Sequence, residues 1–104
     1  MSYNLYEYLA MRLSRKETIA LRLLVAHGGL YGLELVAAAG GELRRGTVYV
    51  TLQRMAAKGL VESRIEEPGA GEQGPARRVF EATGLGRRAL VAQRALDRVF
   101  AGGS

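Results

Sequence analysis

A strongly basic stretch that also carries two threonines is the first feature of this sequence with chemical consequences. Between Arg44 and Arg64, five basic residues stand against one acidic residue, which gives this fifth of the chain a net charge of +4. The whole chain of 104 residues carries a formal charge of +5. Arginine and lysine bind phosphates, while arginine and threonine also hydrogen-bond to base edges. The stretch therefore predicts a polyanionic partner, and double-stranded DNA fits its residue types.

Residue types that catalyse reactions or bind metals are scarce in this chain. It has no cysteine and a single histidine, His27, which excludes thiolate and histidine-based metal sites. His27 stands at a predicted helix end, where we expect it to cap the helix rather than to sense pH. The glycines of residues 69–74 lead into a predicted strand, whereas a phosphate-binding glycine loop leads into a helix. The sequence therefore predicts no enzyme, no metal site and no cofactor.

The length and composition of the chain limit its architecture. A chain of 104 residues with 48% hydrophobic residues fits one small domain. Its longest apolar run is far shorter than the roughly 18 residues of a membrane span. Glu7 interrupts the apolar residues near the N-terminus, where a signal peptide would be uniformly apolar. We expect a cytoplasmic protein with no membrane partner.

Local signals predict three helices in the first half of the chain. Ser14 and Glu17 have the spacing of a capping box, and the glycine pair 28–29 ends the helix that they begin. The segment 31–41 is rich in alanine and ends in two glycines, which predicts a second, short helix. A turn over residues 42–46 then leads into the third helix.

The third helix has two sides of different character. Val48, Leu52 and Met55 recur at intervals of four and three residues, so they share one side and are predicted to pack on the first two helices. Gly59 stands where a helix commonly ends. The opposite side is predicted to face outward and consists of Thr47, Val50, Thr51, Arg54 and Lys58.

A β-hairpin is predicted to follow the third helix. Residues 60–66 alternate in character, which predicts a half-buried strand with Val61 and Ile65 on its inner side. Residues 67–76 hold three glycines and two prolines and therefore predict a loop. Residues 77–83 have the composition of a returning strand.

Three helices followed by a hairpin are the element order of a winged helix-turn-helix, which we predict over residues 14–83. The predicted fold class is mostly α with a small β-hairpin, extended by N- and C-terminal dimerisation helices. The outward side of the third helix suits the major groove of DNA, because arginine binds guanine O6 and N7 and threonine can contact the thymine methyl group.

The segments outside this domain predict a dimer. In the segment 84–104 apolar residues recur at intervals of four and three, which is typical of a helix that packs on a partner helix, although two heptads are too short to hold a dimer alone. The segment 1–13 is predicted to be an N-terminal helix or arm that packs beside it, with a frayed tail as the alternative. The predicted dimer interface consists of Leu5, Leu9, Leu13, Leu85, Ala89, Ala92, Leu96, Val99 and Phe100.

Three motifs of this chain resemble those of the PadR family of bacterial transcription regulators. LYGLEL, at residues 30–35, is similar to the second-helix motif of that family. GTVYVTLQRMAAKGLV, at residues 46–61, resembles its recognition segment. GPARRVFEATGLGRRAL, at residues 74–90, resembles its wing strand and the start of the helix that follows. The three motifs occur in the order and spacing of the family and cover most of the chain, roughly residues 18–90.

The resemblance implies a dimeric regulator of the repressor type, whose third helix enters the major groove and whose wing approaches the flanking backbone or minor groove. The chain departs from the family pattern at Leu33 and Val79, where aromatic residues are usual, and at Val50, where proline is frequent. The residues expected to contact DNA are Arg44, Arg45, Thr47, Tyr49, Val50, Thr51, Arg54, Lys58, Arg77 and Arg78.

Alternatives are open for several of these residues and for the function. Tyr49 is either a core aromatic residue or a phosphate contact. Arg54 and Lys58 can form an ordinary solvated helix face, and Lys58 can instead complement the helix dipole. The alternative function is a winged helix that docks on another protein, although such docking surfaces are usually depleted in charge. The sequence specifies no operator, no regulated genes and no small-molecule effector; an effector would have to bind between subunits near the terminal helices.

Overall fold

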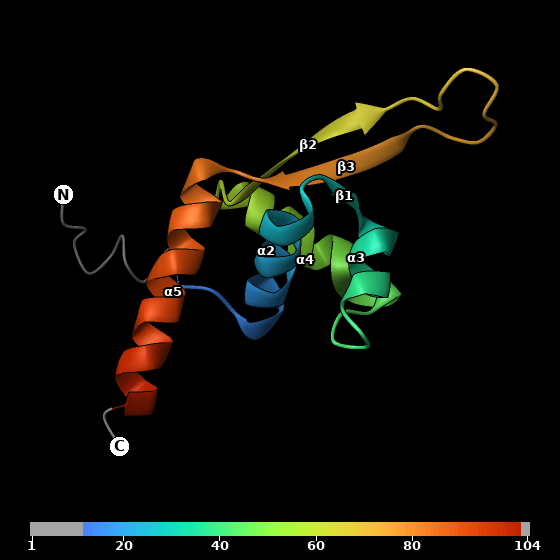
Figure 1. The fold of residues 1–104 in the computed structure, drawn as a ribbon. Helices are drawn as coiled ribbons and strands as arrows, with labels where there is room; N and C mark the ends of the chain where they lie inside the picture. Colours follow the sequence, from blue (N-terminus) through green and yellow to red (C-terminus); the bar gives the residue numbers. More distant parts are fainter. Residues whose placement is uncertain (1–11, 103–104) are drawn as a thin grey trace.

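The computed structural model describes residues 12–102, which form a small helical body with a hairpin and a terminal helix extending from it (Figure 1). The three helices followed by a hairpin confirm the predicted winged helix-turn-helix, mostly α with a small sheet. No helix in this described part has the length and apolar character needed to cross a membrane. In chain order the elements are α2 (Arg15–His27), β1 (Leu30–Tyr31), α3 (Gly32–Ala38), α4 (Arg45–Ala57), β2 (Val61–Glu66), β3 (Arg77–Ala82) and α5 (Gly84–Gly102).

Both ends of α2 lie where the sequence predicted them. The Glu17 backbone N–H donates to Ser14 Oγ at 3.1 Å, and the Ser14 backbone N–H donates to Glu17 Oε1 at 2.8 Å, which completes the capping box. The helix ends at His27, and Gly28 follows with a φ of 79° that suits glycine. These features depend only on neighbouring residues, which is why local sequence signals predict them correctly.

The domain core lies between the three helices and the root of the sheet. Val48, Leu52 and Met55 of α4 are each at most 1% exposed, so the predicted inner side of the third helix is confirmed. Leucines of α2 and α3 complete the same cluster. Leu60 and Val61, which follow α4, are also buried there and join the helix to the root of β2.

The end of α4 is fixed by a Schellman motif around Gly59. The Leu60 N–H donates to the Met55 carbonyl at 2.9 Å, and the Gly59 N–H donates to the Ala56 carbonyl at 3.0 Å. Gly59 has a φ of 77°, which confirms its predicted place just after the helix. The motif turns the chain sharply from α4 into β2.

The sheet differs from the prediction in two respects. A third strand, β1, pairs antiparallel with β3 through Leu30 and Tyr31, where the sequence predicted a helix from Tyr31 onward. A strand of two residues is too short to show an alternating pattern in the sequence. It is recognised only by its pairing with β3. The expectation that β2 is half buried is wrong beyond Val61, since Ile65 is 51% exposed. The outer parts of β2 and β3 extend past the helical body as a free ribbon (Figure 1).

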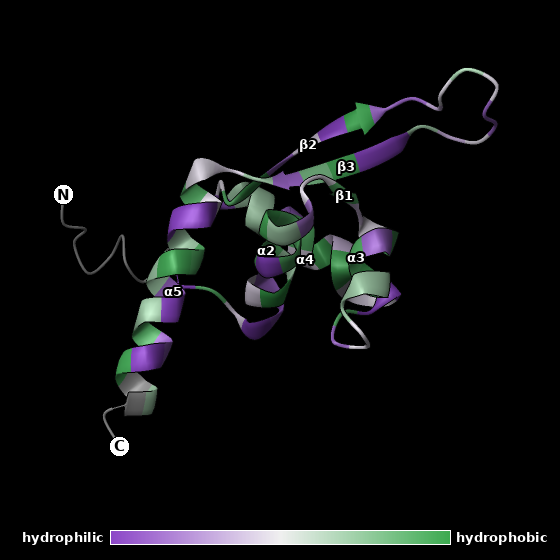
Figure 2. Ribbon diagram, viewed as in Figure 1, coloured by the Kyte–Doolittle hydropathy of each residue, from purple (hydrophilic) through white to green (hydrophobic). Residues whose placement is uncertain are grey.

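The terminal helix α5 packs on the body through its first turns and then runs away from it (Figure 1). Ala89 and Leu90 are each 2% exposed and belong to the domain core. Farther along the helix Val91 and Val99 are both 66% exposed. Figure 2 shows hydrophobic and hydrophilic residues alternating along this helix, as expected of an amphipathic element.

The predicted dimer interface is therefore corrected at its inner end. Leu13 and Ala89 are buried in the core of this chain and are not available to a partner, because burial within the chain satisfies the apolar spacing that suggested one. Leu85 packs against the same core but is only partly buried, so its place in an interface stays a prediction. Leu5 and Leu9 lie outside the described residues.

Candidate nucleic-acid interface

The outward side of α4 is the first part of the candidate site. Thr47, Val50 and Arg54 are exposed, as the sequence predicted, and Val50 retains 49% of its accessible surface. Their spacing of three and four residues places them on neighbouring turns of one helix face. This surface therefore presents a hydroxyl, an isopropyl group and a guanidinium group side by side.

Thr51 does not belong to this surface, and its predicted outward orientation is wrong. It is only 8% exposed, and its hydroxyl donates to the Thr47 carbonyl at 3.3 Å within the helix. It lies three residues after Val48 and four before Met55, so the helical repeat turns it toward the core side. Its polarity suggested exposure, but the hydrogen bond to the helix backbone makes burial tolerable.

Lys58 is engaged within the domain and is not a free cation. Its Nζ donates to the two carboxylate oxygens of Glu17 at 2.8 and 3.0 Å, and Glu17 is only 4% exposed. Burial tends to raise the pKa of Glu17, but the hydrogen bonds from Lys58 and Ser14 outweigh it, and the pKa lies below its ordinary value. The pair ties the end of α4 to the start of α2, so the expectation that Lys58 holds a phosphate gives way to a structural role.

Gln53 is a residue of this face that the sequence pattern did not single out. It is exposed and lies three residues after Val50, directly beside Arg54. A glutamine side chain can bind adenine N6 and N7 with two hydrogen bonds. Its spacing of three residues from Val50 places it on the same helix face and was a sufficient signal to predict its exposure.

The basic residues around the start of α4 are exposed. Arg44 precedes the first turn of the helix and makes no side-chain cap hydrogen bond, and Arg45 begins the helix. Within residues 12–102 no ion pair engages Arg44, Arg45 or Arg54. Their charges are therefore available to an external anion.

Tyr49 of α4 packs on α3 and borders a groove that the first residues of β3 also line. Its ring lies so close to Gly32 that a Cβ placed there would come within 2.7 Å of a ring carbon, yet Tyr49 remains 48% exposed. One side of the ring packs and the other stays accessible, so the phosphate contact of Tyr49 stays a prediction. The accessible side borders a groove of about 530 Å³ that also includes Leu33 and Arg78.

The two arginines at the start of β3, beside the hairpin loop, are held in place by neighbours. The Arg77 guanidinium lies 5.0 Å from the centre of the Tyr31 ring, in a cation–π contact. Arg78 Nη1 donates to Ser63 Oγ at 2.9 Å, across the hairpin. Both residues remain exposed and line the same groove as Tyr49.

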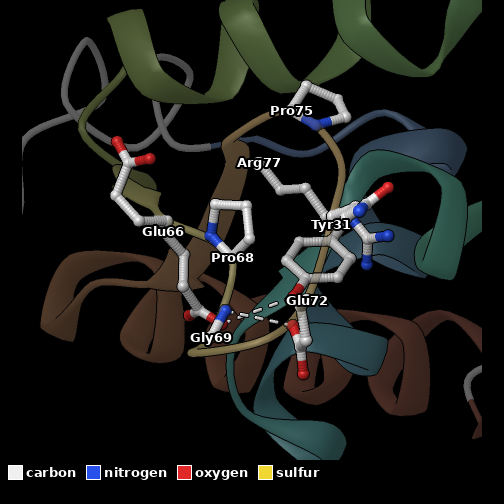
Figure 3. Close-up of a pocket in the computed structure, with 9 residues that line it drawn as sticks. Tyr31, Glu66, Pro68, Gly69, Glu72, Pro75 and Arg77 are labelled. Carbon is white, nitrogen blue, oxygen red and sulfur yellow. Dashed lines mark hydrogen bonds between the residues drawn. The ribbon is translucent and has the colours of Figure 1, made fainter.

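The tip of the wing has the opposite charge. Figure 3 shows Glu66 and Glu72 beside a small pocket of about 250 Å³ in the hairpin loop, with Arg77 at its edge. The Gly69 N–H donates to Glu72 Oε2 at 3.1 Å, and the Glu72 N–H donates to the Gly69 carbonyl at 2.9 Å, so the loop closes on itself. Like-charge repulsion disfavours the acidic loop near phosphates, which leaves Arg77 and Arg78, at the loop-side end of β3, as the part of the hairpin suited to an anion.

An exposed helix that carries arginines, beside a hairpin with Arg77 and Arg78 at the loop-side end of β3, defines a winged helix-turn-helix of the DNA-binding class. Similarity to a known protein family supports this assignment. Residues 20–92 match the model of the Transcriptional regulator PadR-like family, and the chain belongs to this family. The protein is thus a DNA-binding transcriptional regulator. No curated protein matches the chain.

Solved structures of other regulators share this fold. A PadR family regulator from Clostridium difficile R20291 is 23% identical, with a TM-score of 0.72, over 86% of this chain and 93% of that one. A PadR-like transcription factor from Bacteroides fragilis is 24% identical, also with a TM-score of 0.72, over 86% and 88%. A PadR family regulator from Eggerthella lenta DSM 2243 is 26% identical, with a TM-score of 0.68, over 86% and 80%.

Proposed function

We propose that this protein is a cytoplasmic repressor that binds a palindromic operator as a homodimer. The observation that carries the proposal is the exposed face of α4, where arginines that form no ion pair within residues 12–102 flank residues suited to base edges. A protein that occupies an operator overlapping a promoter excludes the polymerase sterically, and this mode of repression needs no further surface.

We assign base contacts to the middle of α4 and phosphate contacts to its surroundings. Arg54 suits guanine, Gln53 suits adenine, and Thr47 can donate, accept or touch a thymine methyl group. Phosphates would be bound by Tyr49 and by the basic residues at the start of α4 and at the start of β3, namely Arg44, Arg45, Arg77 and Arg78. The groove between Tyr49 and the wing would then accommodate one strand of the backbone.

A dimer is required by the limited reach of one helix. A single recognition helix contacts few base pairs, and each mismatch costs only about 1–3 kcal/mol, which is too little to select one site in a genome. The outer half of α5 supports a two-fold partner, because Ala92 and Val99 are exposed and Leu96 is only half buried. A two-fold axis there would place the two α4 helices about 34 Å apart or a multiple of it, on one face of a palindromic site.

The proposal is tested by titrating the purified protein with the DNA upstream of its own coding region. We expect binding to an inverted repeat, and Arg54→Ala should weaken it by about 1–3 kcal/mol with relaxed base preference at one position per half-site. Arg22→Ala, which removes an exposed arginine of α2 outside the proposed interface, is the matched control. Equal affinity of the Arg54 variant and the wild type would refute the assignment of Arg54. Absence of DNA binding even at low salt would favour the protein-docking alternative.

A further inference from the structure

Thr83 forms a joint between the end of the recognition helix and the start of α5. Its hydroxyl donates to the Gly59 carbonyl at 2.6 Å and accepts from the Gly86 N–H at 3.0 Å. Its backbone N–H also donates to the Leu60 carbonyl at 3.0 Å. One side chain therefore connects the turn that ends α4 with the first turn of α5.

Gly86 makes the same joint tight. A Cβ built on Gly86 would lie 2.1 Å from the Leu60 carbonyl oxygen, which no side chain tolerates. The first turn of α5 thus lies directly on the backbone of residues 59–60. The apolar packing of Ala89 and Leu90 holds α5 on the body, but such packing is non-directional. Among the described residues, the hydrogen bonds that join the first turn of α5 to the turn after α4 are those of Thr83.

The direction of α5 has a large effect at its outer end. Leu96 lies thirteen residues beyond Thr83, about 20 Å along the helix at roughly 1.5 Å per residue. A tilt of about 10° at the joint would displace Leu96 by about 3.4 Å, which is the rise of one base pair. In a two-fold dimer both subunits contribute such a displacement.

We propose that Thr83 is a positioning residue that sets the separation of the two recognition helices in the dimer, and so the operator spacing that the protein accepts. The inference rests on the proposed function, since it requires DNA binding by α4 and pairing through α5. Thr83 itself makes no contact with DNA in this account. Its hydroxyl acts by fixing the angle between the two helices.

The test compares Thr83→Val, which keeps the shape and removes the hydroxyl, with Thr83→Ser, which keeps the hydroxyl. Affinities are measured for operators whose half-sites are moved apart or together by one or two base pairs. For the wild type and the Ser variant, we expect each base pair of altered spacing to reduce the affinity by about tenfold or more. For the Val variant, we expect a reduction of less than about threefold. A Val variant with the spacing preference of the wild type would overturn the proposal.

A second measurement needs no DNA. The chain has no cysteine, so a spin label attached at Ala57→Cys, on the exposed side of α4, reports the distance between the two helices of a dimer. We expect a broader distance distribution in the Val variant than in the wild type and the Ser variant, and identical distributions would refute the role of Thr83. If the wild type forms this dimer but binds no operator, the proposed function fails while the distances still decide the role of Thr83. If the Val variant does not fold, Thr83→Ala also removes the hydroxyl without adding a clash and is judged by the same distances.

Discussion

Replacement of Lys58 by methionine should destabilise the domain through the carboxylate that it leaves behind. Glu17 is 4% exposed, and Lys58 approaches it to 2.8 Å. Removal of one partner from a fully buried ion pair costs about 3–5 kcal/mol, whereas exposed pairs contribute about 0–1 kcal/mol. The Lys58 side chain is 37% exposed, and the Ser14 N–H still binds Glu17, so the cost should be intermediate, about 1–3 kcal/mol. That corresponds to a decrease of roughly 4–24 °C in Tm, at about 4–8 °C per kcal/mol for a domain of this size.

The pH dependence of this effect has a definite sign. The pKa of Glu17 in the folded protein lies below its ordinary value of 4.5, because the hydrogen bonds from Lys58 and Ser14 outweigh the effect of burial. A lowered carboxyl pKa stabilises the folded state above about pH 4.5, and this contribution disappears as the pH falls through the folded-state pKa. The difference in stability between the wild type and Lys58→Met should therefore be full at pH 7 and shrink below about pH 4.5.

The assay is urea denaturation followed by circular dichroism at pH 7 and at pH 3.5. Arg15→Met is the matched control, because the Arg15–Glu42 pair has a similar length of 2.7 Å but side chains that are 82% and 49% exposed. Its removal should cost at most about 0.5 kcal/mol. Equal destabilisation by the two variants at pH 7, or an effect of Lys58→Met that does not change with pH, would refute the reasoning.

Three further predictions concern DNA binding and assembly. Gly46→Ala should stabilise the fold by about 0.5–1 kcal/mol, because a Cβ at this position meets open space. It should nevertheless weaken operator binding, because Gly46 lies one turn before Val50 on the proposed DNA face. Tighter binding in a gel-shift titration would contradict that placement. Alanine at Arg77 and Arg78 should lower the slope of log affinity against log salt by roughly 0.9 for each phosphate that is no longer bound. An unchanged slope would show that these two residues do not contact the DNA backbone. Leu96→Asp should give monomers of about 11.2 kDa in light scattering, with an unchanged helical circular dichroism spectrum, whereas a variant that remains dimeric would place the interface elsewhere.

The sequence alone determined the elements whose signals are local. The capping box of Ser14 and Glu17 and the left-handed Gly59 each involve residues within one or two turns, so their types and spacing are sufficient. The inner side of α4 was also predicted, because the helical repeat fixes which residues share a side. These local signals, in their order along the chain, also predicted the winged helix-turn-helix.

The tertiary structure decided what depends on partners distant in the sequence. Glu17 and Lys58 are 41 residues apart, and only the packing of α2 on α4 turns an apparent phosphate ligand into half of an internal ion pair. Ala89 carries the same apolar spacing whether it faces its own core or a second subunit, and only the fold shows that it is buried within its own subunit. A pattern in the sequence specifies that a residue needs a partner, but the identity of that partner is fixed by the three-dimensional path of the chain.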